Sequence, residues 1–212
     1  LYEGRLESVL RERARAGETP NSRVAAFQED VRNFCKKYGE PEGYLCFLLG
    51  DGDHMGKTLD ALPDMAAHQR FSRELSRFAK EARGVVERHA GELIYSGGDD
   101  VMAYLPLHTA LQCASELNSL FGEVMTAACA GSPVTPPTFS AGLVITHHSE
   151  SLAEIFERAR EAEHHAKEFG ARNALAICQN KRGQRGIQLA GKWSDLPERM
   201  REFIDLYLDK AL

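Results

Sequence analysis

The stretch that decides the fold is residues 44–53, YLCFLLGDGD, in which a continuous apolar run ends abruptly in an acidic turn with two glycines. An apolar run of this length is typical of a strand buried on both faces. Residues 95–100, YSGGDD, form a second acidic turn, between short strands expected at about 92–95 and 101–105. The intervening residues 65–89 have the spacing of a long amphipathic helix. The sequence therefore predicts two strands that each lead into, or out of, an acidic turn.

Outward from this centre the chain alternates between helices and strands. We expect helices at about 21–38, 109–125, 151–169 and 193–212, and strands at about 138–146, 174–178 and 186–189. Asn21 or Ser22 would cap the helix at 21–38, and Ser151 would cap the helix at 151–169. Gly170 would end that second helix in a left-handed conformation. This order predicts an α+β fold with a mainly antiparallel sheet and helices packed on one face. We divide the chain into an N-terminal helical segment (1–40), a main domain (41–190) and a C-terminal helix (191–212).

Composition limits the class of protein. The chain has 212 residues, a net charge of −5 and 43% hydrophobic residues, which suits about one globular domain with its own core. No apolar run approaches the ~20 residues of a membrane span. Five widely spaced cysteines without a C-x-x-C pair argue against a zinc finger or a disulfide framework, so we expect a cytoplasmic protein. Because the chain starts at Leu1, we expect a processed protein or a piece of a longer one.

The acidic turns are the candidate functional feature. Asp51 and Asp53 follow one strand, Asp99 and Asp100 precede the next, and adjacent strands would bring these carboxylates together. Such like charges repel and raise each other's pKa, and a divalent cation removes that cost. Mg²⁺ (or Mn²⁺) prefers hard oxygen ligands, commonly one or two carboxylates plus substrate phosphates. The alternative is a pair of ordinary exposed turns, since Gly and Asp are common there. The repetition of the pattern after about fifty residues favours the metal site.

Taken together, LLGDGD, YSGGDD, TFSAGLVITHH, AKEFGARNALAI and KRGQRG resemble a known family. The set resembles the palm domain shared by GGDEF nucleotide cyclases and the large subunit of type III CRISPR effector complexes. It is most similar to the palm with a GGDD motif, which makes cyclic oligoadenylate from ATP. The resemblance covers roughly residues 40–190 and implies a ferredoxin-like palm there.

The resemblance also implies roles for individual residues. Asp51, Asp99 and Asp100 match the catalytic carboxylates that bind metal, and Gly52 matches the position whose backbone carbonyl faces the metal. The nucleotide would lie against the remaining matched positions, which are Gly52, Asp53, Gly97, Gly98, Lys167, Arg172 and Asn173. The structural alternative is that Lys167 and Arg172 are solvent-exposed at the C-terminal end of a helix, where the helix dipole favours positive charge.

Two positions depart from guanylate-specific cyclases. Leu59 stands where those enzymes have an Asn that reads guanine, and Gly91 stands where their Arg-x-x-Asp motif has its Asp. Both departures favour ATP as the substrate. The implied reaction is metal-dependent nucleotidyl transfer.

The resemblance implies partners as well. These are the other subunits of a type III CRISPR effector with guide and target RNA, reached through the full-length protein, and no membrane. Within the family a second palm supplies the other half of the active site. The alternatives are a standalone minimal palm cyclase, which makes a cyclic dinucleotide as a homodimer, and a non-catalytic palm scaffold in a ribonucleoprotein. The net charge of −5 and the short basic cluster 181–185 predict weak binding of RNA by this chain alone.

Overall fold

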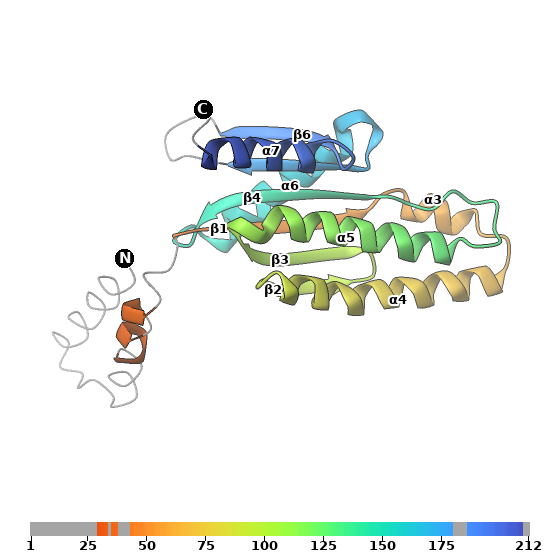
Figure 1. Ribbon diagram of the computed structural model, residues 1–212. Coiled ribbons are helices and arrows are strands. Elements are labelled where there is room, and N and C mark those ends of the chain that lie inside the picture. Colours follow the sequence, from red (N-terminus) through yellow and green to blue (C-terminus); the bar gives the residue numbers. More distant parts are fainter. Residues whose placement is uncertain (1–28, 34, 38–42, 180–185, 210–212) are drawn as a thin grey trace. The chain divides into compact units, whose positions relative to one another are not determined.

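The computed structural model describes residues 29–33, 35–37, 43–179 and 186–209 (Figure 1). The chain divides into two compact units, Leu1–Gly43 and Tyr44–Leu212. In the first unit, residues 29–33 and 35–37 are helical, within the helix expected at 21–38. The expected caps Asn21 and Ser22 and the basic cluster 181–185 lie outside the described residues. All that follows concerns the second unit.

A six-stranded sheet forms the centre of the second unit, in the order β2-β3-β1-β4-β5-β6. The strands are β1 (Tyr44–Gly52), β2 (Glu92–Gly97), β3 (Asp100–Pro106), β4 (Phe139–His147), β5 (Ala174–Gln179) and β6 (Ile187–Lys192). Four of the five strand pairs are antiparallel, and β4 with β5 is the parallel pair. The expected α+β fold with a mainly antiparallel sheet is confirmed, and β6 is longer than the short extension expected at 186–189.

The helices follow the expected order with adjusted ends. They are α3 (Met55–Asp60), α4 (Met65–Arg88), α5 (Leu107–Ala128), α6 (Leu152–Glu168), the short 3-10 turn η1 (Phe169–Ala171) and α7 (Leu196–Leu208). The Ser151 hydroxyl accepts a hydrogen bond from the Glu154 backbone N–H, as its predicted capping role requires. Gly170 has a φ of 51°, so the predicted left-handed end of α6 is also confirmed. None of the described helices combines the length and apolarity needed to cross a bilayer.

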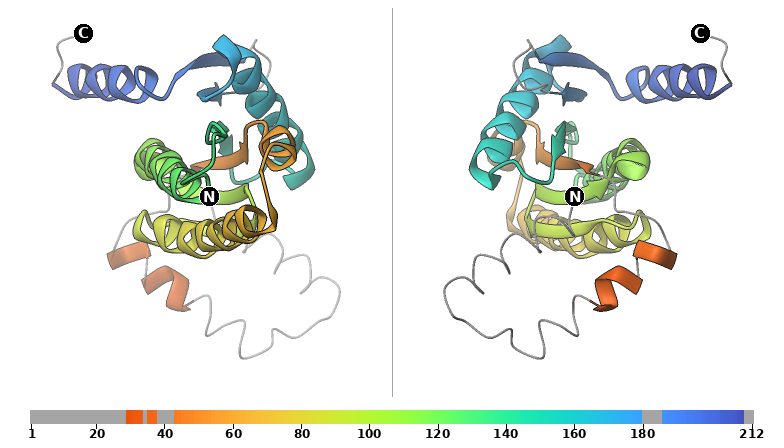
Figure 2. Two further views of the ribbon diagram at one scale, coloured as in Figure 1. Left: turned by 90° about the vertical axis from the view of Figure 1, so that its right-hand side faces the viewer. Right: turned by 90° about the vertical axis from the view of Figure 1, so that its left-hand side faces the viewer.

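Helices cover both faces of the sheet, so the expectation that they pack on one face is wrong. Along β1 successive side chains point to opposite faces. Cys46 and Leu48 belong to the core beneath α4 and α5, whereas Phe47 belongs to the smaller core beneath α6 (Figure 2). The physical reason is space: α4 and α5 already cover the first face, so α6, the crossover connection that the parallel β4–β5 pair requires, packs on the other.

An aromatic cluster fixes the end of β1 where the acidic turn begins. Phe139 on β4 is buried among Phe78, Phe121 and Trp193, and the Trp193 indole N–H donates to the Phe139 carbonyl at 2.7 Å. A side chain at Gly50 would meet the Phe139 ring, since an added Cβ would lie 2.2 Å from its Cζ. Burial of one such aromatic ring contributes about 1.5–3 kcal/mol. The cluster therefore sets the register between β1 and β4 just before Asp51.

Candidate functional site

The two acidic turns lie side by side because β1 and β3 are direct neighbours in the sheet. Gly50 of β1 pairs with Val101 of β3, so the next residue of β1, Asp51, lies beside the start of β3 at Asp100. Gly97 and Asp100 close a two-residue turn, in which Gly98 has a φ of 68° that favours glycine. The pairing of two buried strands therefore places carboxylates from separate parts of the sequence in one small volume.

Gly52 is packed against the second acidic turn. A Cβ added at Gly52 would lie 2.9 Å from both Cβ and Oδ2 of Asp99, and 2.8 Å from Cγ of Met55. Those distances are shorter than van der Waals contacts, so only glycine lets the Asp99 carboxylate approach the end of β1 this closely. The Asp99 side chain thus lies directly against the backbone of Gly52.

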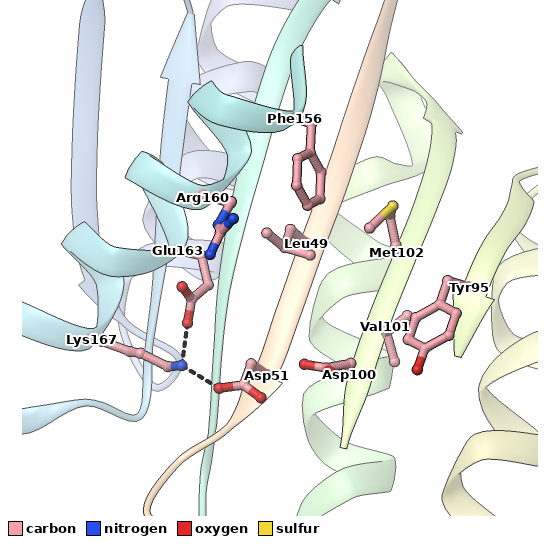
Figure 3. Close-up of a pocket in the computed structure, with 10 residues that line it drawn as sticks. All are labelled: Leu49, Asp51, Tyr95, Asp100, Val101, Met102, Phe156, Arg160, Glu163 and Lys167. Carbon is pink, nitrogen blue, oxygen red and sulfur yellow. Dashed lines mark hydrogen bonds and ion pairs between the residues drawn. The ribbon is translucent and has the colours of Figure 1, made fainter. Parts of the chain in front are cut away.

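A pocket of about 410 Å³ opens beside these carboxylates, between the sheet and α6 (Figure 3). Its volume is within the range of small-molecule sites. The lining residues come from β1, β2, β3 and α6, and are Leu49, Asp51, Tyr95, Asp100, Val101, Met102, Phe156, Arg160, Glu163 and Lys167. Asp51, Asp100 and Lys167 lie at its polar end, whereas Leu49, Met102 and Phe156 give its other end an apolar wall (Figure 3).

Lys167 supplies a positive charge directly to the acidic end of this pocket. Its ammonium group forms an ion pair with Asp51 and a second one with Glu163, one helical turn earlier, at 2.5 Å (Figure 3). Burial alone would lower the pKa of Lys167, but its bonds to Asp51 and Glu163 outweigh burial and raise the pKa. Lys167 therefore stays charged at neutral pH.

Asp99 and Asp100 hold protons more tightly than ordinary carboxyl groups. Burial, followed by hydrogen bonding to Asp51 and repulsion from Asp51 and Asp99, raises the pKa of Asp100 to about 7. Burial is also the largest cause that raises the pKa of Asp99, and the charge of Asp51 adds to it. Both shifts are what crowded carboxylates produce without a compensating cation.

The oxygen atoms at this end fit a divalent cation. No group of three or more Asp, Glu, His or Cys side chains within the described ranges forms a ready-made metal cage. Mg²⁺ does not require one, because it usually binds one or two carboxylates and completes its shell with water and substrate phosphates. The proximity of Asp51, Asp99 and Asp100, the glycine that admits Asp99, and the raised pKa values agree with such an open site.

Asp53 lies elsewhere than the sequence suggested. Its side chain is completely buried, and its oxygens accept hydrogen bonds from the hydroxyls of Thr138 at 2.7 Å and Ser140 at 2.9 Å. It also accepts the backbone N–H of Asn173 at 3.0 Å and pairs with the Arg172 guanidinium at 3.4 Å. Because these groups enclose the carboxylate, Asp53 contacts protein rather than the pocket.

Arg172 and Asn173 adjoin this buried carboxylate and are absent from the pocket lining that the structure describes. Arg172 has a φ of 72° and a ψ of −164°, a region that is essentially restricted to glycine and costs about 1–3 kcal/mol. Gly97 is covered by the phenol of Tyr95, since an added Cβ would lie 2.0 Å from the Tyr95 hydroxyl. The structure therefore brings Asp51, Gly52, Asp99, Asp100 and Lys167 together, and groups Asp53 with Arg172 and Asn173.

The sequence analysis missed the residues of α6 that line the pocket. Phe156, Arg160 and Glu163 precede Lys167 by eleven, seven and four positions, which is the spacing of one helix face. That spacing in the sequence could have identified them, because residues one, two or three helical turns before Lys167 lie on the same face of the helix. The positions of Leu49 and Met102 in the pocket could not be predicted from the sequence, since apolar residues of a strand are expected in a core.

Comparison with known proteins identifies the family. The profile described as "Cas10/Cmr2, second palm domain" matches residues 44–176. The chain belongs to the Cas10/Cmr2 palm family. It is similar to the CRISPR system Cmr subunit Cmr2 of Pyrococcus furiosus, with 32% identity over 205 residues. The similarity covers 84% of this chain and 22% of that relative, so the chain spans about a fifth of the relative's length.

Solved structures share the fold of this Cas10/Cmr2 palm. A Csm1–Csm4 cassette in complex with cA4 matches with a TM-score of 0.53 and 18% identity, over 74% of this chain and 24% of that one. The GGDEF domain of DgcB from Caulobacter crescentus, in complex with c-di-GMP, matches with a TM-score of 0.50 and 20% identity, over 72% of this chain and 88% of that one. At these identities the similarity shows the palm cyclase fold alone.

Proposed function

We propose that this Cas10/Cmr2 palm binds ATP together with Mg²⁺ or Mn²⁺ and carries out nucleotidyl transfer that builds cyclic oligoadenylate in type III CRISPR defence. The observation that carries the proposal is that Asp51 and Asp100 converge beside Lys167 at one end of the 410 Å³ pocket, with Asp99 interacting with Asp51. Membership of the palm family and the neighbouring cyclase folds support the same reaction class.

The proposed reaction joins two nucleotides. The 3′-hydroxyl oxygen of one ATP loses its proton to solvent and forms a bond to the α-phosphorus of another ATP, and the bond from that phosphorus to the bridging oxygen breaks, so that pyrophosphate leaves with the electron pair. A metal bound by Asp51, Asp99, Asp100 and the Gly52 carbonyl would lower the pKa of the hydroxyl and offset charge on the phosphoryl oxygens. The chain itself supplies positioning and fixed charge, which account for most of the acceleration in phosphoryl transfer.

Charge and shape give the nucleotide one orientation in the pocket. The triphosphate would lie at the end with Lys167, whose ammonium group donates to phosphate oxygens while Glu163 retains it. The nucleoside would then lie along Leu49, Met102 and Phe156, which exclude water from one side of it (Figure 3). No covalent intermediate with a side chain is required.

We propose that the facing half of the active site comes from another part of the full-length protein, within a complex that also contains guide and target RNA. A homodimer of this chain is the alternative arrangement, and a non-catalytic scaffold is the alternative function. The complete set of three carboxylates argues against the scaffold.

Incubation of the 212-residue chain with ATP and Mg²⁺, followed by chromatography of the products, tests the function. Because this chain supplies one palm, we expect slow formation of pyrophosphate and linked or cyclic adenylates by the wild type, through pairs of chains that face each other, and none by Asp51→Asn. Asp60→Asn is the matched control, because Asp60 is an exposed carboxylate at the end of α3 and should leave product formation unchanged. Equal product from Asp51→Asn and the wild type would contradict the proposed catalytic site.

A further inference from the structure

A bulge in the edge strand β2 decides where the Tyr95 side chain points. Tyr95 pairs with Met102 of β3, and the register shifts between Leu93 and Tyr95, so that Ile94 is an extra residue. In a regular ladder Tyr95 would pair with Val101 instead, whose side chain is fully buried in the core. Because neighbouring residues of a strand point to opposite faces, the shift of one residue moves Tyr95 from the core to the pocket.

The molecule keeps this shifted register although it buries a polar group. Ser96 takes the position opposite Val101, and among the described residues its buried hydroxyl oxygen has no hydrogen-bond partner. A buried hydroxyl without a partner destabilises the folded chain. Bulges that re-aim a side chain are frequent beside active sites. The cost at Ser96 therefore indicates that the position of Tyr95 matters to function.

The Tyr95 ring is fixed along one edge and open elsewhere. A Cβ added at Gly97 would lie 2.4 Å from Cζ of Tyr95, so only glycine leaves room for the ring above this backbone. The side chain is nevertheless 52% exposed, and no other aromatic ring contacts it within the part of the chain that the structure describes. A rigid and exposed ring beside a pocket is suited to stack on a planar ligand.

Charge in the pocket is concentrated on the side away from Tyr95. Tyr95 and Lys167 lie at opposite ends of the row that contains Asp51 and Asp100 (Figure 3). Both cations of the described pocket lining, Arg160 and Lys167, belong to α6, which attracts a triphosphate to that side. In an in-line displacement at phosphorus, the attacking and leaving oxygens lie on opposite sides. The Tyr95 side is therefore where an attacking nucleoside hydroxyl would arrive.

We propose that Tyr95 forms a second nucleoside subsite, in which its ring stacks on the adenine of the nucleotide that supplies the 3′-hydroxyl. This inference rests on the proposed function. The first nucleotide keeps its triphosphate at Lys167, and Asp100 lies between the two subsites (Figure 3). Stacking uses the face of a base rather than its hydrogen-bonding edge, so Tyr95 holds this nucleoside without selecting its base.

Calorimetric titration of adenosine tests this inference on the 212-residue chain, with Mg²⁺ and one equivalent of α,β-methylene-ATP already added. A carbon atom replaces the bridging oxygen in this analogue, so it occupies the first subsite and cannot react. We expect Tyr95→Ala to weaken adenosine binding about tenfold, which is about 1.4 kcal/mol. We expect Tyr95→Phe to bind adenosine within about twofold of the wild type, because stacking needs the ring and not the hydroxyl.

The affinity for the analogue separates stacking from support of the acidic turn. Tyr95→Ala should leave that affinity within about twofold, whereas collapse of the turn that carries Asp100 would weaken both ligands. Tyr207→Ala is the matched control, because it removes an exposed tyrosine on α7 and should change neither affinity. If Tyr95→Ala does not fold, Tyr95→Leu replaces it, since leucine keeps apolar bulk above Gly97 and has no ring face.

The outcomes separate this inference from the function on which it rests. Binding of the analogue by every variant, with loss of adenosine only where the ring is removed, supports both. Three results overturn the second subsite and leave the proposed function intact: no adenosine binding by the loaded wild type, equal adenosine binding by Tyr95→Ala and the wild type, or the same loss in Tyr95→Phe. Equal weakening of both ligands in Tyr95→Ala overturns the subsite as well. Absence of analogue binding by the wild type in Mg²⁺ overturns both proposals.

Discussion

Replacement of Asp100 by Asn should stabilise the folded chain at alkaline pH in metal-free buffer. The amide can still donate a hydrogen bond to Asp51, but it carries no charge beside Asp51 and Asp99. The pKa of Asp100 is raised from 3.8 to about 7 in the folded chain, so its ionised form is disfavoured there. The ionised Asp100 carboxylate therefore lowers the free energy of unfolding, and Asp100→Asn removes this cost.

The size of the effect follows from the shift. Three pKa units correspond to about 4 kcal/mol for a fully buried group. Asp100 is only partly buried, so solvent screening reduces the expected gain to about 1 kcal/mol. For a chain of this length, that gain raises the melting temperature by about 2–4 °C.

The sign of the pH dependence is fixed by linkage. A carboxyl group whose pKa is raised by folding destabilises the folded state when it ionises. The cost is absent below the unfolded pKa of about 4, grows as the pH rises, and is complete above the folded pKa of about 7. The advantage of Asp100→Asn should therefore be largest at pH 8 and smaller at pH 5.

Thermal melts at pH 8 and pH 5 in EDTA, and at pH 8 with millimolar Mg²⁺, are the assay. Mg²⁺ should raise the melting temperature of the wild type and have less effect on Asp100→Asn. Asp205→Asn, which removes an exposed carboxylate on α7, should melt like the wild type throughout. Equal melting of Asp100→Asn and the wild type at pH 8, or a difference that is the same at both pH values, would refute the reasoning.

Four further outcomes are expected. Asp99→Ala with Asp100→Ala should abolish adenylate synthesis and keep the far-ultraviolet circular dichroism of the wild type; full turnover of ATP in this variant would oppose a catalytic role. ATP should bind more tightly than GTP in calorimetric titrations, because the apolar wall of Leu49, Met102 and Phe156 leaves the additional polar groups of guanine without hydrogen bonds, at about 1–3 kcal/mol for each unpaired polar group. Gly52→Ala should weaken Mg²⁺-dependent ATP binding about tenfold, since the added methyl displaces Asp99; unchanged affinity would show that this close approach is dispensable. Labelled RNA should bind the chain only weakly in fluorescence anisotropy at physiological salt, and submicromolar affinity would argue against the expectation from net charge.

The sequence predicted those features that local chemistry controls. The acidic hairpin, the buried strand before Asp51, the cap at Ser151 and the left-handed Gly170 all depend on a few neighbouring residues. The adjacency of β1 and β3 was also predictable, since a buried strand and the nearby hairpin have few other ways to share one core.

Features set by distant contacts were not predictable. The helix α3 has six residues, which are too few to show a periodic pattern. A helix this short is stable only through its contacts with the rest of the fold. Asp53 stands in a Gly-Asp turn, which is the signature of an exposed position. Its burial depends on hydroxyls 85 and 87 residues away, at Thr138 and Ser140. The placement of α6 on the opposite face likewise depends on distant contacts, because α4 and α5 already cover the first face.

Titration of ATP into the wild-type chain, in Mg²⁺ and again in EDTA, tests the central claim most directly. With Mg²⁺ the carboxylates of Asp51, Asp99 and Asp100 should share a cation with the triphosphate, and ATP should bind. In EDTA the same carboxylates would face the triphosphate as like charges at close range, so binding should be lost. Asp51→Asn should also lose the difference between the two conditions. Equal affinity for ATP in Mg²⁺ and in EDTA would contradict the account, because the acidic turns would then not form the nucleotide site.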